Sequence, residues 1–142
     1  MIQIREAEDG DAGVISVLLV ELGYELSVDG VLDRLTEYGK IGGRIWVAVD
    51  DGVVVGFLSF QFTTFFHAVG KSGRITAMCV GNGYRRKGIG RQLLQRMESH
   101  AKSEGCERIE VTSGEYRSEE AHRFYEAEGY APASRRFLKN LN

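Results

Sequence analysis

The sequence has few of the features that mark membrane, secreted or metal-binding proteins. No apolar run approaches the roughly 20 residues that a transmembrane helix requires. The first residues, MIQIREAEDGD, lack the basic start and long apolar stretch of a secretory signal. Only two cysteines are present, Cys79 and Cys106, and they form no CxxC pair. We therefore expect a cytoplasmic protein with reduced thiols, no membrane association and no metal site.

The sequence also has a small net charge and little proline. The formal net charge is -2 over 142 residues, and Pro132 is the only proline. A balance this close to neutral argues against a nucleic-acid partner, so any basic site must be local. The length allows one domain with a real core and is too short for two ordinary domains. No repeat, linker or internal boundary interrupts the chain.

The spacing of apolar residues predicts strands that alternate with helices. Strands are expected at residues 2–6, 44–49, 53–62, 74–80, 109–113 and 134–141, with an Asp-Gly turn at residues 50–52. Helices are expected after a cap at Asp9 or Asp11, over residues 31–38, from about Gly88 to Gly105, and after Ser118. The apolar face of the third helix consists of Ile89, Leu93, Leu94, Met97 and Ala101. This order predicts an α/β domain with a mixed β-sheet.

A loop rich in glycine and positive charge joins the strand that ends at Val80 to the third helix. Its sequence, GNGYRRKGIGR at residues 81–91, contains Arg85, Arg86, Lys87 and Arg91 around Gly88 and Gly90. The first N–H groups of a helix lack intrahelical partners and lie at the positive end of its dipole, so such a loop can hold a phosphate or pyrophosphate. The alternative is a solvated basic turn. The pattern is neither a Walker loop nor a dinucleotide fingerprint, because the residues that complete those motifs are missing.

Two separated motifs resemble those of the GNAT-type N-acetyltransferases. RRKGIG at residues 85–90, after the apolar MCV, matches the family's Arg/Gln-x-x-Gly-x-Gly/Ala motif, and AHRFYEAEGY at residues 121–130 matches its Ala-x-x-Phe-Tyr segment. The order of elements also agrees, so the resemblance covers essentially the whole chain. It implies one N-acetyltransferase domain over residues 1–142, with a mixed sheet of about six to seven strands and about four helices.

The resemblance further implies acetyl-CoA as co-substrate. Backbone N–H groups from Arg86 to Arg91 are expected to hold its pyrophosphate, and a backbone N–H of the strand before the loop polarises the thioester carbonyl. Tyr125 is expected to protonate the departing CoA thiolate, since a phenol of ordinary pKa about 10 can deliver a proton to a thiolate. The predicted cofactor-binding residues are Met78, Cys79, Val80, Arg85, Arg86, Lys87, Gly88, Ile89, Gly90, Arg91 and Ser118.

The sequence departs from the family pattern in two places. The strand before the loop has Thr76 and Ala77 where relatives often carry an acidic general base, and Ser118 stands where many have an asparagine that bonds the pantetheine. Candidates for the missing base are Glu21, Glu25, His67 and Glu115. A water chain is an alternative, and the sequence does not assign the base.

Several interpretations of the site stay open. Tyr125 on the inner face of an amphipathic helix also fits core packing. Cys79 could form an acyl intermediate, although no histidine neighbours it in sequence. Direct attack by the amine in a ternary complex is the preferred mechanism. The rival functions are a non-catalytic acyl-CoA-binding module, which the missing base supports, and acetylation of a protein lysine or N-terminus.

The acceptor is expected to be a primary amine on a small molecule. Residues 21–37 include Glu21, Glu25, Asp29, Asp33 and Glu37, an acidic set that would attract a cation or simply be solvated. FFHAVGKSG, RSEEAHRFYEAEGY and RRFLKNL resemble small-molecule acetyltransferases of the aminoalkylphosphonate type, in which case Arg74 or Arg117 would meet the phosphonate. Homodimers are common in the family, so a homodimer is possible here.

Overall fold

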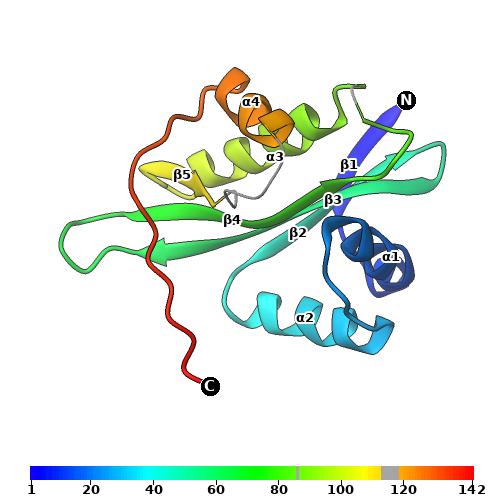
Figure 1. Cartoon of the computed structure of the whole chain (residues 1–142), viewed down its shortest axis with the longest axis horizontal. Helices are drawn as coiled ribbons and strands as arrows, with labels where there is room; N and C mark the ends of the chain where they lie inside the picture. The colour runs from blue at the N-terminus through cyan, green and yellow to red at the C-terminus, as the bar shows by residue number, and fades with distance from the viewer. Residues whose placement is uncertain (86, 113–118) are drawn as a thin grey trace. The chain divides into compact units, whose positions relative to one another are not determined.

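A five-stranded sheet organises the first part of the chain. The computed structural model describes residues 1–85, 87–112 and 119–142, which fall into two compact units, Met1–Thr112 and Ser113–Asn142. The strands lie side by side in the order of the sequence, with the first four antiparallel and the last pair parallel (Figure 1). Their bounds are β1 (Ile2–Glu6), β2 (Arg44–Asp50), β3 (Val53–Thr64), β4 (Lys71–Val80) and β5 (Arg108–Val111). The predicted mixed α/β sheet is confirmed.

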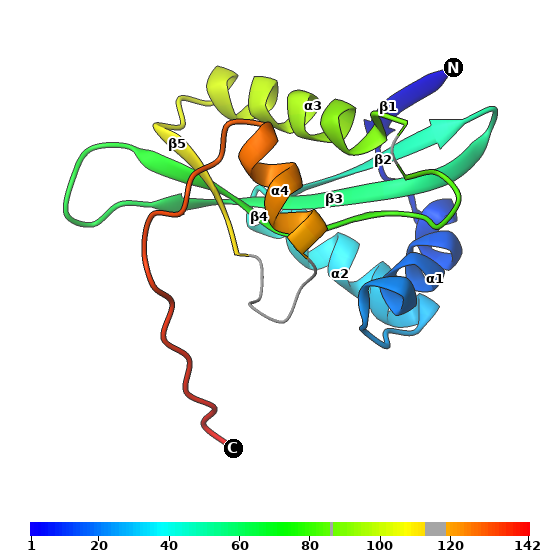
Figure 2. The same cartoon turned by 45° about the horizontal axis from the view of Figure 1, so that its top comes forward.

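Helices cover both faces of this sheet. The helices α1 (Ala12–Leu22) and α2 (Val28–Lys40) lie on one face, and α3 (Ile89–Ser103) lies on the other (Figures 1 and 2). The second unit contains α4 (Glu119–Ala127). α2 begins three residues earlier than the sequence predicted, because the Ser27 hydroxyl accepts a hydrogen bond of 3.0 Å from Gly30 N and caps the helix.

Local sequence explains the β2–β3 hairpin. Asp51 and Gly52 form its two-residue turn with φ values of 48° and 83°. Positive φ at both positions matches the right-handed twist of the flanking strands, and Asp-Gly adopts it readily. The hairpin sets the register in which Val47 faces Phe57 across the strands.

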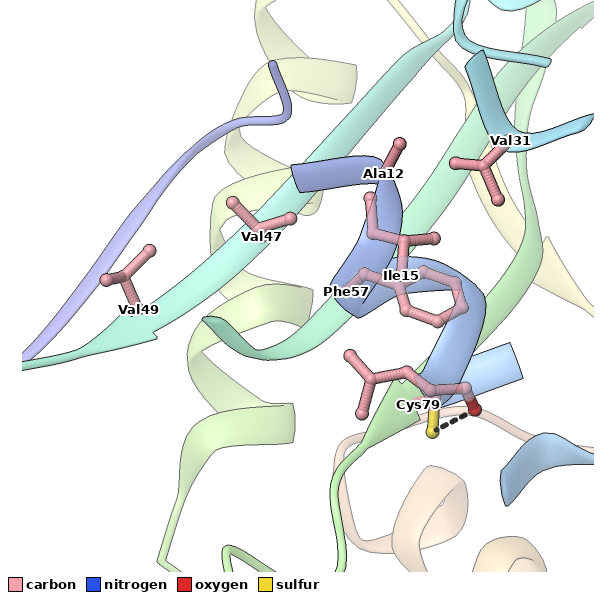
Figure 3. Packing of buried hydrophobic residues seen from close by; sticks show 8 residues of the cluster. Ala12, Ile15, Val31, Val47, Val49, Phe57 and Cys79 are labelled. Carbon is pink, nitrogen blue, oxygen red and sulfur yellow. Dashed lines mark hydrogen bonds between the residues drawn. The ribbon is translucent and has the colours of Figure 1, made fainter. Parts of the chain in front are cut away.

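Two apolar layers hold the first unit together. The layer beneath α1 and α2 contains Ala12, Ile15, Leu18, Val31, Val47, Val49, Phe57 and Cys79, each less than a tenth exposed (Figure 3). On the opposite face, all five apolar residues predicted for α3 are buried, with at most 1% exposure. The first layer therefore packs α1 and α2 against residues of β2, β3 and β4.

Two expectations differ from the structure. The described residues form five strands, fewer than the six to seven expected, because residues 134–141 are not a strand. Asp11 occupies the cap position of α1 without a side-chain bond to that helix. Its carboxylate instead accepts bonds of 2.8 and 3.0 Å from Arg5 and of 2.7 Å from Glu8 N. These bonds lower the pKa of Asp11 below its usual value, with the Arg5 hydrogen bond as the main cause.

His100 on α3 packs inside an aromatic cluster. Its ring centre lies 5.3 Å from Trp46, 6.0 Å from Phe60 and 6.1 Å from Phe62. Its Nε2 atom is buried and has no hydrogen-bond partner among the described residues. Burial, and next the charge of Arg44, lowers the pKa of His100 below 6.5. The folded protein therefore favours a neutral imidazole.

This shift predicts that stability falls as the solution becomes acidic. The unfolded chain takes up a proton near pH 6.5 while the folded chain resists it. The contribution of His100 is therefore fully present above pH 6.5 and is lost as pH falls toward its lower folded-state pKa. Denaturant unfolding between pH 5 and pH 8 should show a shallower pH slope for His100→Phe than for the wild type. His67→Phe is the control, since His67 is exposed; an unchanged slope in His100→Phe would refute this origin.

Candidate functional site

The loop between β4 and α3 begins with a tight turn. Gly81 N donates to Val55 O at 2.8 Å, which ties the end of β4 to β3, and Tyr84 N donates to Gly81 O at 3.1 Å. Gly83 in this turn has a φ of 87°, a value that glycine adopts without steric penalty. The turn directs the following basic residues toward the start of α3.

Gly88 is the N-cap of α3 and has a φ of 77°. Gln92 N donates to Gly88 O at 3.1 Å, which is the first bond of the helix. The N–H groups of Ile89, Gly90 and Arg91 therefore precede the intrahelical ladder and point out of its positive end. A methyl group built at Gly83 or Gly88 would meet no atom within 4 Å, so the space beside these two glycines is open. The arrangement fits a multiply charged anion such as a pyrophosphate.

The cations of the loop differ in their surroundings. Arg85 Nε donates to Val80 O at 3.2 Å, and this bond joins the basic part of the loop to the end of β4. The Lys87 ammonium is 5.6 Å from the centre of the Tyr84 ring, and Arg91 is exposed on the first turn of α3. Arg86 lies outside the described residues. Arg85, Lys87 and Arg91 thus add positive charge around the helix start.

The predicted base candidates are scattered. Glu21 on α1 accepts a hydrogen bond of 2.8 Å from Asn82 N and so anchors the glycine loop. Glu25 is exposed in the connection between α1 and α2, and His67 is exposed between β3 and β4, with its ring 5.5 Å from Phe65. Glu115 lies outside the described residues. Sequence reasoning missed the loop-anchoring contact of Glu21, which joins residues 61 positions apart.

The side chain of Cys79 faces the core. The residue is 5% exposed, and its Sγ donates to Leu18 O at 3.5 Å (Figure 3). A thiol buried between β4 and α1 is not accessible to a thioester, which argues against an acyl-cysteine mechanism. Met78 and Val80 are half-buried and pair with Leu58 and Gly56. Any contact of Cys79 with a cofactor is therefore limited to its backbone.

β4 carries an irregularity where β5 ends. β5 pairs with β4 only from Ser72 to Ile75, so the second half of β4 continues beyond the last pair, Ile75 and Val111. At this point Ser59 faces Ala77 and Phe60 faces Ile75, which leaves Thr76 as an extra residue in a β-bulge. Thr76 is exposed. Bulges of this kind occur beside active sites, where they redirect a side chain and free backbone groups from pairing.

The second unit contains the predicted acid. Tyr125 on α4 is half-buried, with its ring 5.3 Å from Phe124 and 5.9 Å from Tyr130. The helix ends at Ala127, and Gly129 follows with a φ of 95°, a conformation typical of the residue just after a helix C-terminus. Ser118 lies outside the described residues. Tyr125 is thus held within an aromatic cluster by its ring.

No helix among residues 1–85, 87–112 and 119–142 is long and apolar enough to cross a bilayer. In the same residues, no group of three histidine, cysteine or acidic side chains is placed to hold a metal ion.

Comparison with known proteins gives one consistent result. A model of the acetyltransferase (GNAT) family matches residues 18–130. The aminoalkylphosphonate N-acetyltransferase of Salmonella typhimurium is 34% identical over 144 aligned residues, which cover 98% of this chain and 91% of the relative.

Solved structures agree on the fold. Glucosamine-6-phosphate N-acetyltransferase from Arabidopsis thaliana superposes with a TM-score of 0.86 at 23% identity, covering 100% of this chain and 99% of that one. An aminoglycoside N-acetyltransferase in complex with CoA superposes with a TM-score of 0.85 at 16% identity, covering 99% of this chain and 94% of that one.

Proposed function

Since the chain belongs to the acetyltransferase (GNAT) family and is an N-acetyltransferase, we propose that it transfers the acetyl group of acetyl-CoA to a primary amine of a small molecule. The observation that carries this proposal is the glycine loop, whose helix start and surrounding cations suit the CoA pyrophosphate. The whole chain, residues 1–142, is proposed to act as one N-acetyltransferase domain.

The proposed reaction is direct attack in a ternary complex. The neutral amine attacks the thioester carbonyl carbon, a C–N bond forms, and the C–S bond breaks. The nitrogen loses one proton and the departing thiolate gains one, so the products are an amide and the CoA thiol. Acetyl-CoA supplies an activated acyl group, and the protein supplies orientation, hydrogen-bond donors and a proton.

Each element of the site takes one part of this reaction. The N–H groups at the start of α3 bind the pyrophosphate, and the exposed cations of the loop strengthen that contact. A backbone N–H of β4 beyond the bulge polarises the thioester carbonyl. Tyr125 gives its phenolic proton to the thiolate.

Aminoalkylphosphonates are the first candidates for the acceptor. The proposal is supported by the Salmonella relative, which aligns along nearly all of this chain. Arg74 on β4 is a half-buried cation, with Nη atoms 3.1 Å from Glu110 Oε1 and 2.9 Å from Thr112 Oγ1. A phosphonate could share this guanidinium, since planar Arg donors suit tetrahedral oxyanions. Arg117, the other candidate, lies outside the described residues.

A comparison of acceptors tests this substrate class. Acetylation of aminoethylphosphonate should exceed that of ethylamine by about tenfold or more in kcat/KM, because a charge-assisted contact is worth roughly 1.5–3 kcal/mol. A peptide with a free N-terminus and a lysine tests the protein-acetylating alternative. Equal rates for aminoethylphosphonate and ethylamine would show that the phosphonate is not recognised.

A further inference from the structure

Three hydroxyl groups from α2, β3 and β4 meet at the bulge. The Tyr38 hydroxyl lies 2.6 Å from Thr76 Oγ1, which lies 2.8 Å from Ser59 Oγ. Ser59 Oγ in turn lies 3.4 Å from the backbone oxygen of Ala77. These contacts form a continuous chain that ends at a backbone carbonyl.

The carbonyl offers one consistent direction for the chain. The Ala77 oxygen can only accept, and the Ser59 hydroxyl has a single proton to donate to it. When Ser59 donates to Ala77, its Oγ accepts from Thr76, and Thr76 Oγ1 accepts from the Tyr38 hydroxyl, although either atom of these two pairs can be the donor. In this arrangement the Tyr38 proton is bonded to Thr76. What the phenol oxygen presents outward is a lone pair, which recognises an N–H donor.

The Tyr38 ring is fixed in this position. Gly43 N donates to Tyr38 O at 2.8 Å, and a Cβ atom built at Gly43 would lie only 2.8 Å from Tyr38 Cδ2. The ring thus packs directly on glycine backbone at the start of β2 and extends to Thr76 on β4. A side chain held at both ends binds a ligand group with little further loss of conformational entropy.

The Tyr38 hydroxyl lies beside the part of β4 that is proposed to contact the thioester. Thr76 is the extra residue of the bulge, immediately after the last β4–β5 pair, on the strand that carries the proposed thioester contact. We propose that the Tyr38 hydroxyl accepts a hydrogen bond from the nitrogen of the acceptor amine and positions it for attack. Thr76 and Ser59 are positioning residues that orient the phenol. This inference rests on the proposed function and assigns the contact that binds the amine.

The contact orients the nitrogen without removing its proton. A neutral phenol is a hydrogen-bond acceptor and a very weak base. Tyr38 therefore affects how the amine is held, and it acts separately from the proton donor Tyr125. It also occupies the region where the sequence shows Thr76 and Ala77 in place of an acidic residue.

Tyr38→Phe tests the inference, because it keeps the ring and removes the oxygen. Aminoethylphosphonate is titrated calorimetrically into the CoA-bound wild type and into each variant, which measures amine binding without turnover. Tyr38→Phe should raise the amine Kd about tenfold, as expected for one lost bond to a charged donor, and leave the CoA Kd unchanged. Steady-state KM for the amine should rise in parallel, more than kcat falls.

Matched variants separate this role from a structural one. Thr76→Val should reproduce the defect, because the phenol proton loses its acceptor, whereas Thr76→Ser should restore amine affinity. Tyr24→Phe is the control, since Tyr24 is an exposed tyrosine between α1 and α2. Unchanged amine affinity in Tyr38→Phe would overturn the inference, as would an equal loss of CoA affinity or a wild type that binds no amine. A wild type that binds the amine through Tyr38 but transfers no acetyl group would refute the proposed function alone.

Discussion

Replacing Gly90 with aspartate is expected to weaken acetyl-CoA binding about 100-fold. Gly90 is the second residue of α3, among the N–H groups assigned to the pyrophosphate. A carboxylate there faces a multiply charged anion, and two such charges a few ångströms apart repel by roughly 3 kcal/mol in a partly exposed site. Calorimetric titration of CoA measures the effect.

Gly13→Asp supplies the matched control. Gly13 is the second residue of α1, so the same substitution is made at the same position of another helix, where an added Cβ meets no atom within 4 Å. An acidic residue in a first helical turn favours the helix, so neither variant should unfold. If Gly90→Asp binds CoA as tightly as Gly13→Asp does, the pyrophosphate does not bind at the start of α3.

Tyr125→Phe is expected to lower kcat about 100-fold with little change in CoA affinity. The ring contacts with Phe124 and Tyr130 persist in phenylalanine, while the proton for the thiolate is lost. General acids of this kind contribute roughly 10²–10⁴-fold to rate. Thiol release under saturating acetyl-CoA and amine gives kcat directly.

Tyr130→Phe tests the same aromatic cluster without the proposed acid. Its ring lies 5.9 Å from Tyr125, so any general effect of losing a hydroxyl from this cluster should appear in both variants. The prediction is near-normal turnover for Tyr130→Phe. Full activity in Tyr125→Phe would remove this tyrosine from the mechanism.

Sequence alone predicts most of the fold because the elements are strongly periodic. The apolar face of α3 repeats at helical spacing, and all five of its predicted residues are buried. The β2–β3 hairpin follows from Asp51 and Gly52 at its turn. The segment at residues 134–141 is the exception, because the pattern of SRRFLKNL predicts a strand, yet these residues pair with no strand in the described part of the chain.

The candidate site is predictable only where it is local in sequence. The glycine loop and the start of α3 lie within residues 80–91, so their residue spacing is enough to predict them. The bulge at Thr76 depends on the register between β3 and β4, and the Tyr38 contact joins residues 38 positions apart. Similarly, the Asp11 carboxylate accepts a hydrogen bond from Arg5 on β1 and makes none to the helix that it was expected to cap. Such contacts arise from tertiary packing and leave no short-range pattern.

Thiol release from acetyl-CoA in the presence of a panel of primary amines, run beside calorimetric titration of CoA, tests the central claim most directly. We predict CoA binding by the wild type and thiol release that requires one class of amine, with aminoalkylphosphonates foremost. Binding without release for any amine would support a non-catalytic acyl-CoA-binding module. No CoA binding at all would contradict the assignment of the glycine loop and, with it, the proposed function.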